Sequence, residues 1–203
     1  RTLLYHDIFD YPLAEEEIWR FLISKNTIEK KAFRQEVGRI NSVVFRKDGY
    51  LYMENRAVSV ENRLKRKNES LGKLKIAKDI ADKLSRIPTV LFIGISGSLA
   101  MMNAKGDDDI DLFVITSRNT IWATRSLIIA YLKLLRRHRK RAETNPKDKI
   151  CLNMIIDEDR LELPASYRNL YGAHELIQLK PLVSKDNIYE KFIQANKWID
   201  KGV

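Results

Sequence analysis

Four aspartates occur within five positions of the chain, and two of them have the spacing of a divalent-cation site. Asp109 and Asp111 alternate with apolar residues in the stretch DIDLFVIT, residues 109–116. Side chains two positions apart leave the same face of a β-strand, so these carboxylates are expected on one face, roughly 6 to 7 Å apart along the backbone. Their mutual repulsion is relieved by an oxygen-preferring cation, Mg²⁺ or Mn²⁺. We expect Asp107 and Asp108, which precede the apolar run, to be solvated.

A phosphate-binding turn is predicted a few residues earlier. Gly97 permits a close approach of the backbone, and Ser98 offers a hydroxyl and an amide at a helix start. Ser98 would serve equally well as an ordinary helix cap. Lys105, in the following loop, could contact a phosphate or could simply be solvated. Gly97, Ser98 and Lys105 are therefore the candidate nucleotide-binding residues.

The elements that must position these residues are two strands and a short helix between them. TVLFIGIS (89–96) and DIDLFVIT (109–116) have the composition of buried strands, and GSLAMMNA (97–104) indicates a turn into a short helix. A largely apolar helix over residues 118–137 and a third strand, ICLNMIID (150–157), follow. Residues 165–200 indicate two further helices around Pro181. The phosphate turn and the carboxylates are thus expected on neighbouring elements.

This pattern resembles the nucleotidyltransferase superfamily that includes DNA polymerase β and kanamycin nucleotidyltransferase. Ser96, Gly97 and Ser98 are followed by ten residues and then by Asp109 and Asp111, each with an apolar neighbour. The chain departs from the superfamily signature only at its leading position, where the signature has an apolar residue. The resemblance covers residues 88–160. It implies transfer of a nucleoside monophosphate from an NTP to an acceptor hydroxyl. The aspartates would hold Mg²⁺ or Mn²⁺, and Gly97 and Ser98 would receive the phosphates.

The third carboxylate that this superfamily usually carries is missing. We align its position with Asn153, which can ligate a metal through its carbonyl oxygen but cannot accept a proton. Asp157 has the same parity, but four residues along a strand span about 13 Å. Asp107 and Glu175 are the alternatives that remain. Slow catalysis, a different base, and nucleotide binding without catalysis all stay open.

The first part of the chain predicts a winged-helix-like domain. Residues 1–57 indicate three short helices, the third over 28–40, and then a hairpin around Lys47, Asp48 and Gly49. The stretches DIFDYPL and ELIQLKPL carry a weaker likeness to proteins with such a region ahead of a nucleotidyltransferase domain. We therefore expect an α+β chain. A winged-helix-like domain (1–57) would precede a basic connecting helix (58–87) and a nucleotidyltransferase-type mixed β-sheet flanked by helices (88–203).

A DNA-binding regulator with a degenerate nucleotide-binding domain is the alternative function. Winged helices bind duplexes through one helix and a basic wing. The residues that would contact DNA here are Lys30, Lys31, Arg34, Arg39, Arg46 and Lys47.

Charge and composition favour a polyanionic partner in the cytoplasm. The 203 residues include 37 Lys and Arg against 27 Asp and Glu, a net charge of +10 that attracts nucleic acid or nucleotide phosphates. No apolar run reaches the roughly 18 residues of a membrane span, and the single cysteine, Cys151, excludes an intramolecular disulfide. An NTP and an unknown acceptor are the expected partners, with nucleic acid as a further candidate. Trp19, Trp122 and Trp198 are expected in the core, and His6, His138 and His174 at the surface or as hydrogen-bonded core residues.

Overall fold

A four-stranded mixed sheet carries the acidic run. The structure is a computed structural model that describes residues 1–24, 28–39, 43–140 and 142–201. The sheet order is β6-β5-β4-β7, where β4 is Val90–Ile95, β5 is Ile110–Thr116, β6 is Ile150–Asp157 and β7 is Lys180–Ser184. β4 is antiparallel to both of its neighbours, β5 and β7, whereas β5 and β6 are parallel. The expected α+β fold with a mixed sheet is confirmed.

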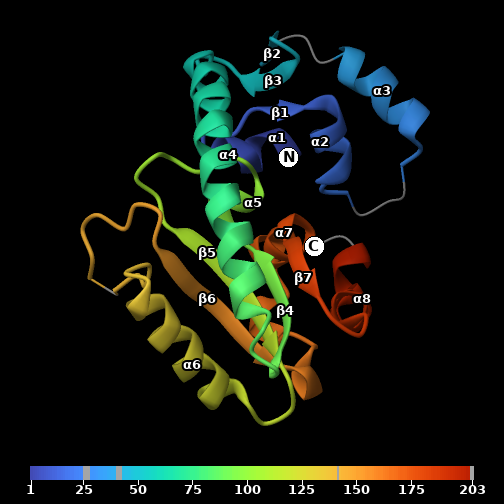
Figure 1. The fold of residues 1–203 in the computed structure, drawn as a ribbon. Helices are drawn as coiled ribbons and strands as arrows, with labels where there is room; N and C mark the ends of the chain where they lie inside the picture. Colours follow the sequence, from blue (N-terminus) through green and yellow to red (C-terminus); the bar gives the residue numbers. More distant parts are fainter. Residues whose placement is uncertain (25–27, 40–42, 141, 202–203) are drawn as a thin grey trace.

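Helices cover both faces of this sheet (Figure 1). α4 (Val58–Leu84) and α6 (Ile121–Leu134) cover one face, and α7 (Leu170–Gln178) and α8 (Ile188–Ala195) cover the other. Side chains of β5 alternate between the two cores, with Leu112 and Val114 in the first and Phe113 and Ile115 in the second. Asp111 has the parity of Phe113. It therefore leaves the sheet on the side of α7.

The predicted turn between the first two strands of this sheet is present. A short helix, α5 (Gly97–Ala100), follows β4, and the chain then passes through the acidic loop into β5. Short 3₁₀ turns lie at Glu158–Arg160, Ala165–Tyr167 and Lys197–Lys201.

The N-terminal part forms a second, smaller unit of three helices and a hairpin, with a short strand between the first two helices that was not predicted. Its helices are α1 (Thr2–Asp7), α2 (Glu15–Arg20) and α3 (Lys30–Arg39), and its three-stranded antiparallel sheet has the order β1-β3-β2. β1 is Leu13–Ala14, β2 is Val44–Lys47 and β3 is Tyr50–Met53. Asp48 and Gly49 both have positive φ, as a two-residue hairpin turn requires. Ile40, the predicted end of the third helix, lies outside the described residues.

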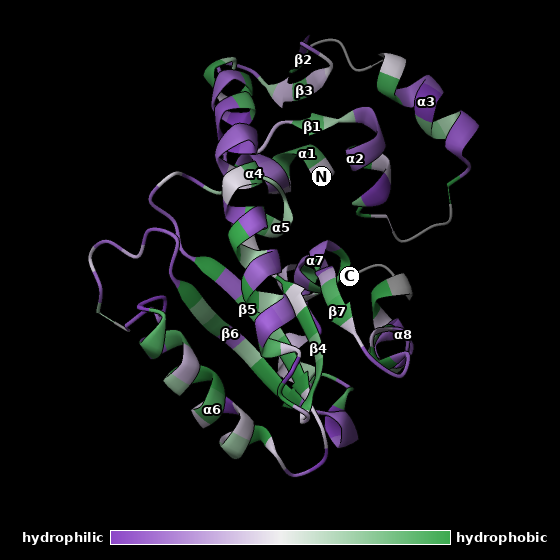
Figure 2. Ribbon diagram, in the orientation of Figure 1, coloured by the Kyte–Doolittle hydropathy of each residue, from purple (hydrophilic) through white to green (hydrophobic). Residues whose placement is uncertain are grey.

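α4 is the longest helix of the described chain and packs against both units (Figure 1). Its C-terminal half contributes Ala77, Ile80 and Leu84 to the core of the large sheet. Figure 2 shows α4 as largely hydrophilic beside the apolar strands, yet two of its charged residues, Arg63 and Lys73, are buried. The predicted connecting helix is therefore present, and it is also part of the packing.

The two helices expected around Pro181 are α7 and α8, but the strand between them was not predicted. Pro181 lies in this strand, β7, where a proline is tolerated because β7 is at the edge of the sheet. The expectation that Trp122 lies in the core is wrong. Trp122 is 79% exposed, because α6 buries only the stripe that includes Ile128 and Leu132.

Within the described residues, none of the helices combines the length and hydropathy that crossing a membrane requires.

Candidate functional site

Three potential ligand groups converge at the start of β5. One atom each of the Asp109 and Asp111 carboxylates and the Cys151 thiol lie within 4.8 Å of one another. Asp109 directly precedes β5, Asp111 is its second residue, and the parallel register places Cys151 of β6 beside Asp111. The predicted convergence of the two aspartates is therefore present, with a cysteine as the third member.

The glycine turn lies directly against this cluster. Gly97 has a φ of +62°, and a Cβ at this position would lie 2.8 Å from Asp111 Oδ2. Both the conformation and the space therefore favour glycine here. The structure brings Gly97 and Asp111 together, as the spacing of the motif predicts.

Arg139 approaches the cluster and was not anticipated from the sequence. Its Nη1 lies 2.9 Å from Asp109 Oδ2 and 3.5 Å from the Cys151 sulfur. The backbone of Arg139, after α6, donates to the carbonyl of Ile150 and is thereby held beside β6. The guanidinium thus supplies a positive charge to Asp109. No spacing rule connects residues 109 and 139, so only the fold reveals this contact.

The carboxylates fit a hard divalent cation, and the thiol does not. Burial, helped by the charge of Asp109, raises the pKa of Asp111 to about 6, so this group is mostly ionised at neutral pH. Burial raises the pKa of Cys151 to about 11, so its sulfur stays a neutral thiol, and Mg²⁺ favours oxygen over sulfur ligands. Two oxygen ligands are therefore available, and Arg139 stands where it would compete with a cation at Asp109.

Asp108 and Lys105 stabilise the loop before β5. Asp108 Oδ2 accepts from the Lys105 backbone at 2.8 Å and from Ser98 Oγ at 3.3 Å. Lys73 of α4, buried to 3% exposure, donates to the carbonyls of Gly106 and Asp108 and to Asp148. Asp107 is exposed, as expected, whereas Asp108 makes structural contacts that the sequence did not indicate.

Asn153 is not paired with Asp109 or Asp111 in the sheet. The register between β5 and β6 shifts at this point, and the Asn153 amide donates to Ser96 Oγ at 3.1 Å. Cys151, rather than Asn153, is the residue paired with Asp111. Asn153 as a metal ligand stays a prediction. Asp157 accepts from the Asn119 and Asp159 amides at the far end of β6, in agreement with its exclusion.

A pocket of about 360 Å³ opens beside the glycine turn. One side is polar and includes Gly97, Ser98, Lys105, Asp108 and Glu175. Burial raises the pKa of Glu175, and the charge of Asp111 adds to this effect. The predicted phosphate-contacting residues therefore share one hollow with an alternative base.

The other side of this pocket is aromatic. Tyr5 stacks on His174 with ring centroids 4.3 Å apart, and His6 meets His174 edge-on at 5.0 Å. His6 Nε2 and His174 Nδ1 are buried without a hydrogen-bond partner. The two histidines show no common spacing in the sequence, so their pairing is a product of the contact between α1 and α7.

Most of the cations proposed to contact DNA are already paired. Lys30 and Arg34 bind Glu16, Arg46 binds Glu15 and Lys47 binds Glu61; the N···O distances of these pairs are 2.8, 3.2, 3.6 and 2.9 Å. Such exposed pairs add little stability, but they reduce the positive potential of this face.

Comparison with known proteins gives solved structures of low similarity. No family model matches the chain, and no curated protein matches it. A solved structure described as a toxin–antitoxin with AMP-PNP matches with a TM-score of 0.34 and 18% sequence identity, over 58% of this chain and 82% of that one. A likeness of this size carries no conclusion about fold or function.

Proposed function

We propose that this protein is a metal-dependent nucleotidyltransferase whose centre is formed by Asp109, Asp111 and the Gly97–Ser98 turn. The single observation that supports this most directly is the contact between Gly97 and Asp111, where a Cβ would approach the carboxylate to 2.8 Å. A glycine backbone at a carboxylate allows a phosphate and its cation to approach the same point. The substrate would be an NTP, and residues 1–57, 58–87 and 88–203 would be its three parts.

Asp109 and Asp111 would hold Mg²⁺ or Mn²⁺. When bound, the cation neutralises phosphate charge and stabilises charge that develops during transfer. Asp111, with a pKa of about 6, is ionised at neutral pH and ready for this role. Arg139 keeps a positive charge beside Asp109 and has to move aside when the cation binds.

The pocket residues would orient the nucleotide and the acceptor. The Ser98 hydroxyl and Lys105 line the polar side, where phosphates would lie, and the Tyr5–His174 stack offers a surface for a planar base. Glu175 has a raised pKa, which suits a group that accepts a proton from an acceptor hydroxyl. Asn153 cannot perform that step, so Glu175 is our candidate for it.

Labelled NTPs would test this proposal. Wild-type protein is incubated with each of ATP, CTP, GTP and UTP and with Mg²⁺ in a cell extract, and transfer of label is measured. We expect Asp109→Ala and Asp111→Ala to reduce metal-dependent transfer by roughly 100-fold or more, the order of loss when one group that stabilises transition-state charge is removed. Asp82→Ala, an exposed aspartate of α4, is the charge-matched control and keeps transfer.

A measurement of metal binding tests the proposed centre independently of the transfer reaction. Removal of the Arg139 charge should strengthen Mn²⁺ binding in Arg139→Gln by about tenfold or more, because a nearby like charge opposes the cation. Binding of Mn²⁺ that is unchanged by Asp109→Ala and Asp111→Ala would refute the proposed centre. If metal and nucleotide bind but no label is transferred, the protein binds nucleotides without catalysing transfer.

A further inference from the structure

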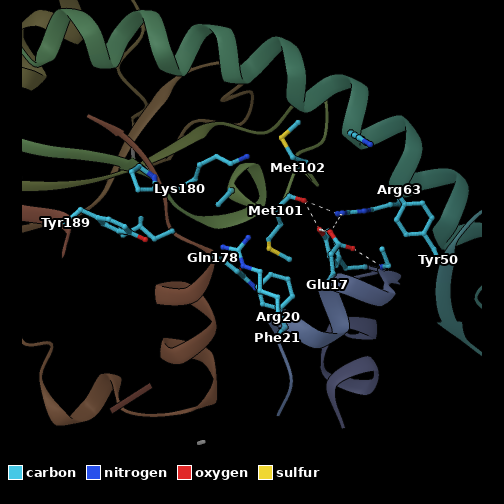
Figure 3. Close-up of a pocket in the computed structure, with 16 residues that line it drawn as sticks. Glu17, Arg20, Phe21, Tyr50, Arg63, Met101, Met102, Gln178, Lys180 and Tyr189 are labelled. Atoms are coloured by element: carbon cyan, nitrogen blue, oxygen red, sulfur yellow. Dashed lines mark hydrogen bonds and ion pairs between the residues drawn. The ribbon is translucent and has the colours of Figure 1, made fainter. Parts of the chain in front are cut away.

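A second hollow, with a volume of about 540 Å³, lies between the N-terminal unit and the large sheet. Figure 3 shows Lys180 and Tyr189 on one side, Arg63 and Tyr50 on the other, and Met101 and Met102 between them. Its size is within the range of small-molecule sites. It is distinct from the pocket beside the glycine turn, since Gly97, Ser98 and Lys105 line that pocket and do not line this one.

The hollow has more positive charge than its surroundings balance. Arg20, Arg63, Lys67 and Lys180 line it, and Glu17 is the one carboxylate among the lining residues. Glu17 forms an ion pair with Arg63, in which Glu17 Oε1 lies 2.6 Å from Arg63 Nη2. Three cations are therefore left without a balancing carboxylate in the lining.

The hydrogen-bond partners of these three cations confirm the imbalance. Arg20 donates to the carbonyl of Ile177 and forms no ion pair with any described residue. The side chains of Lys67 and Lys180 have neither a hydrogen bond nor an ion pair within the described chain. Burial, and then the positive charges of Arg20 and Lys78, lower the pKa of Lys180. The exposed Arg20 and the half-buried Lys180 thus repel each other in the lining of the same hollow.

We propose that this hollow binds a small organic phosphate, with its phosphate between Arg20 and Lys180 and its apolar part against Tyr189 and Met101. A dianion balances two cations, whereas a monocarboxylate balances only one, so the charge favours phosphate. Aromatic rings and methionines supply an adaptable apolar surface for the rest of the ligand.

The second hollow does not depend on nucleotidyl transfer. Tyr11, Met101 and Gln178 line both hollows, so they form the wall between them. Met101 O, in that wall, accepts hydrogen bonds from Tyr11 and Arg63. A ligand in the second hollow would rest on the segment that follows Gly97 and Ser98, without contact with the metal-binding carboxylates.

The test uses three probes that share a phenyl ring and differ in the group attached to it: phenyl phosphate, benzoate and phenol, measured by titration calorimetry in the absence of metal. We expect phenyl phosphate to bind and benzoate and phenol to bind at least about tenfold more weakly, since each charge-assisted hydrogen bond contributes roughly a factor of ten. Arg20→Gln with Lys180→Gln should weaken phenyl phosphate binding by roughly tenfold or more. Lys75→Gln with Lys133→Gln, two exposed lysines elsewhere, is the charge-matched control and keeps affinity.

Separate measurements keep the outcomes distinct. Asp111→Asn should leave phenyl phosphate binding unchanged, so failure of nucleotide binding and failure of this site are distinguishable. Single Lys180→Gln, which leaves the Arg20–Ile177 hydrogen bond in place, serves if the double variant does not fold. Equal binding of benzoate and phenyl phosphate, equal loss in the control pair, or binding of oligonucleotides but not of phenyl phosphate by the wild type would each overturn the proposal.

Discussion

Gly97 is constrained both by its backbone conformation and by its contact with the candidate metal ligand Asp111. Its positive φ and its contact with Asp111 Oδ2 both disfavour a side chain. We predict that Gly97→Ala lowers the free energy of unfolding by about 1 to 3 kcal/mol, from backbone strain and displacement of the carboxylate. Mn²⁺ affinity should fall as well. Urea denaturation and metal titration measure the two effects.

Gly72→Ala is the matched control for this change. Gly72 lies in the middle of α4, and no neighbouring atom lies within 4 Å of the point that an alanine methyl group would occupy. Alanine should therefore stabilise the helix by about 0.5 to 1 kcal/mol. The same substitution is thus expected to have opposite signs at the two sites. Unchanged stability and metal binding in Gly97→Ala would show that the turn tolerates a side chain.

His174 gives the protein a pH-dependent stability term. Burial, with the nearby His6, lowers its pKa to about 4 from 6.5. The unfolded chain therefore binds more protons than the folded chain between about pH 4 and 6.5, and stability is lost as pH falls through this window. We predict that acidification from pH 7.5 to 5 removes about 2 kcal/mol through His174.

A comparison with His174→Gln isolates this term, measured by urea denaturation at several pH values. Asp111 and Glu175 have raised pKa values and act in the opposite direction, because each folded carboxyl retains its proton to a higher pH. The informative quantity is therefore the difference in free energy of unfolding between the wild type and His174→Gln. Between pH 7.5 and pH 5, the wild type should lose about 2 kcal/mol more than the variant loses. Parallel pH profiles would contradict the assignment to His174.

At the scale of elements, α4 acts as a support for the acidic loop. Lys73 reaches from this helix to Gly106, Asp108 and Asp148 and is almost fully buried. We predict that Lys73→Met lowers the free energy of unfolding by about 3 to 5 kcal/mol, because it leaves a carboxylate and two carbonyls without their donor. Urea denaturation measures the loss.

The exposed Lys75, two positions along α4, provides the control. Lys75→Met should change stability by less than about 0.5 kcal/mol, as is usual for surface substitutions. Equal effects of the two changes would mean that the Lys73 contacts contribute no more than a solvated side chain.

Elements with a strong hydrophobic pattern were predictable, and contacts between distant elements were not. Periodicity predicts β4, β5 and β6. The spacing of the motif predicts that Gly97 and Asp111 lie close together. β7 escaped prediction because Pro181 argues against a strand unless the strand is known to be an edge. The pairing of Cys151 with Asp111 depends on a register shift at Asn153, and Arg139 enters the cluster through the loop after α6. Composition carries no signal for either.

At the scale of the whole molecule, Arg63 joins the two units. This buried residue of α4 binds Glu17 of α2 at 2.6 Å and the Met101 carbonyl at 2.9 Å, and it lies 3.6 Å above the Tyr11 ring. Met101 follows the glycine turn, so one side chain connects the N-terminal unit to the candidate site. Such a buried network should couple the unfolding of the two units.

Two tryptophans report on the two units separately. Trp19 packs against Phe33 in the N-terminal unit, and Trp198 packs against the cluster formed by α7 and α8. Variants that retain only one of them, with Trp122 and the other replaced by Phe, allow each transition to be followed by fluorescence in urea. Coincident transitions are the expected result for the wild-type background, since they indicate one cooperative unit.

We predict that Arg63→Met separates these transitions. Loss of the guanidinium leaves the half-buried Glu17 carboxylate without its cation, at a cost of about 3 kcal/mol that falls first on the N-terminal unit. The Trp19 transition should therefore move to lower urea than the Trp198 transition, while Lys65→Met, an exposed change on the same helix, leaves them coincident. If both transitions instead moved together in Arg63→Met, the coupling would have to reside in the rest of the α4 packing, and the link between the N-terminal unit and the glycine turn would not depend on this side chain.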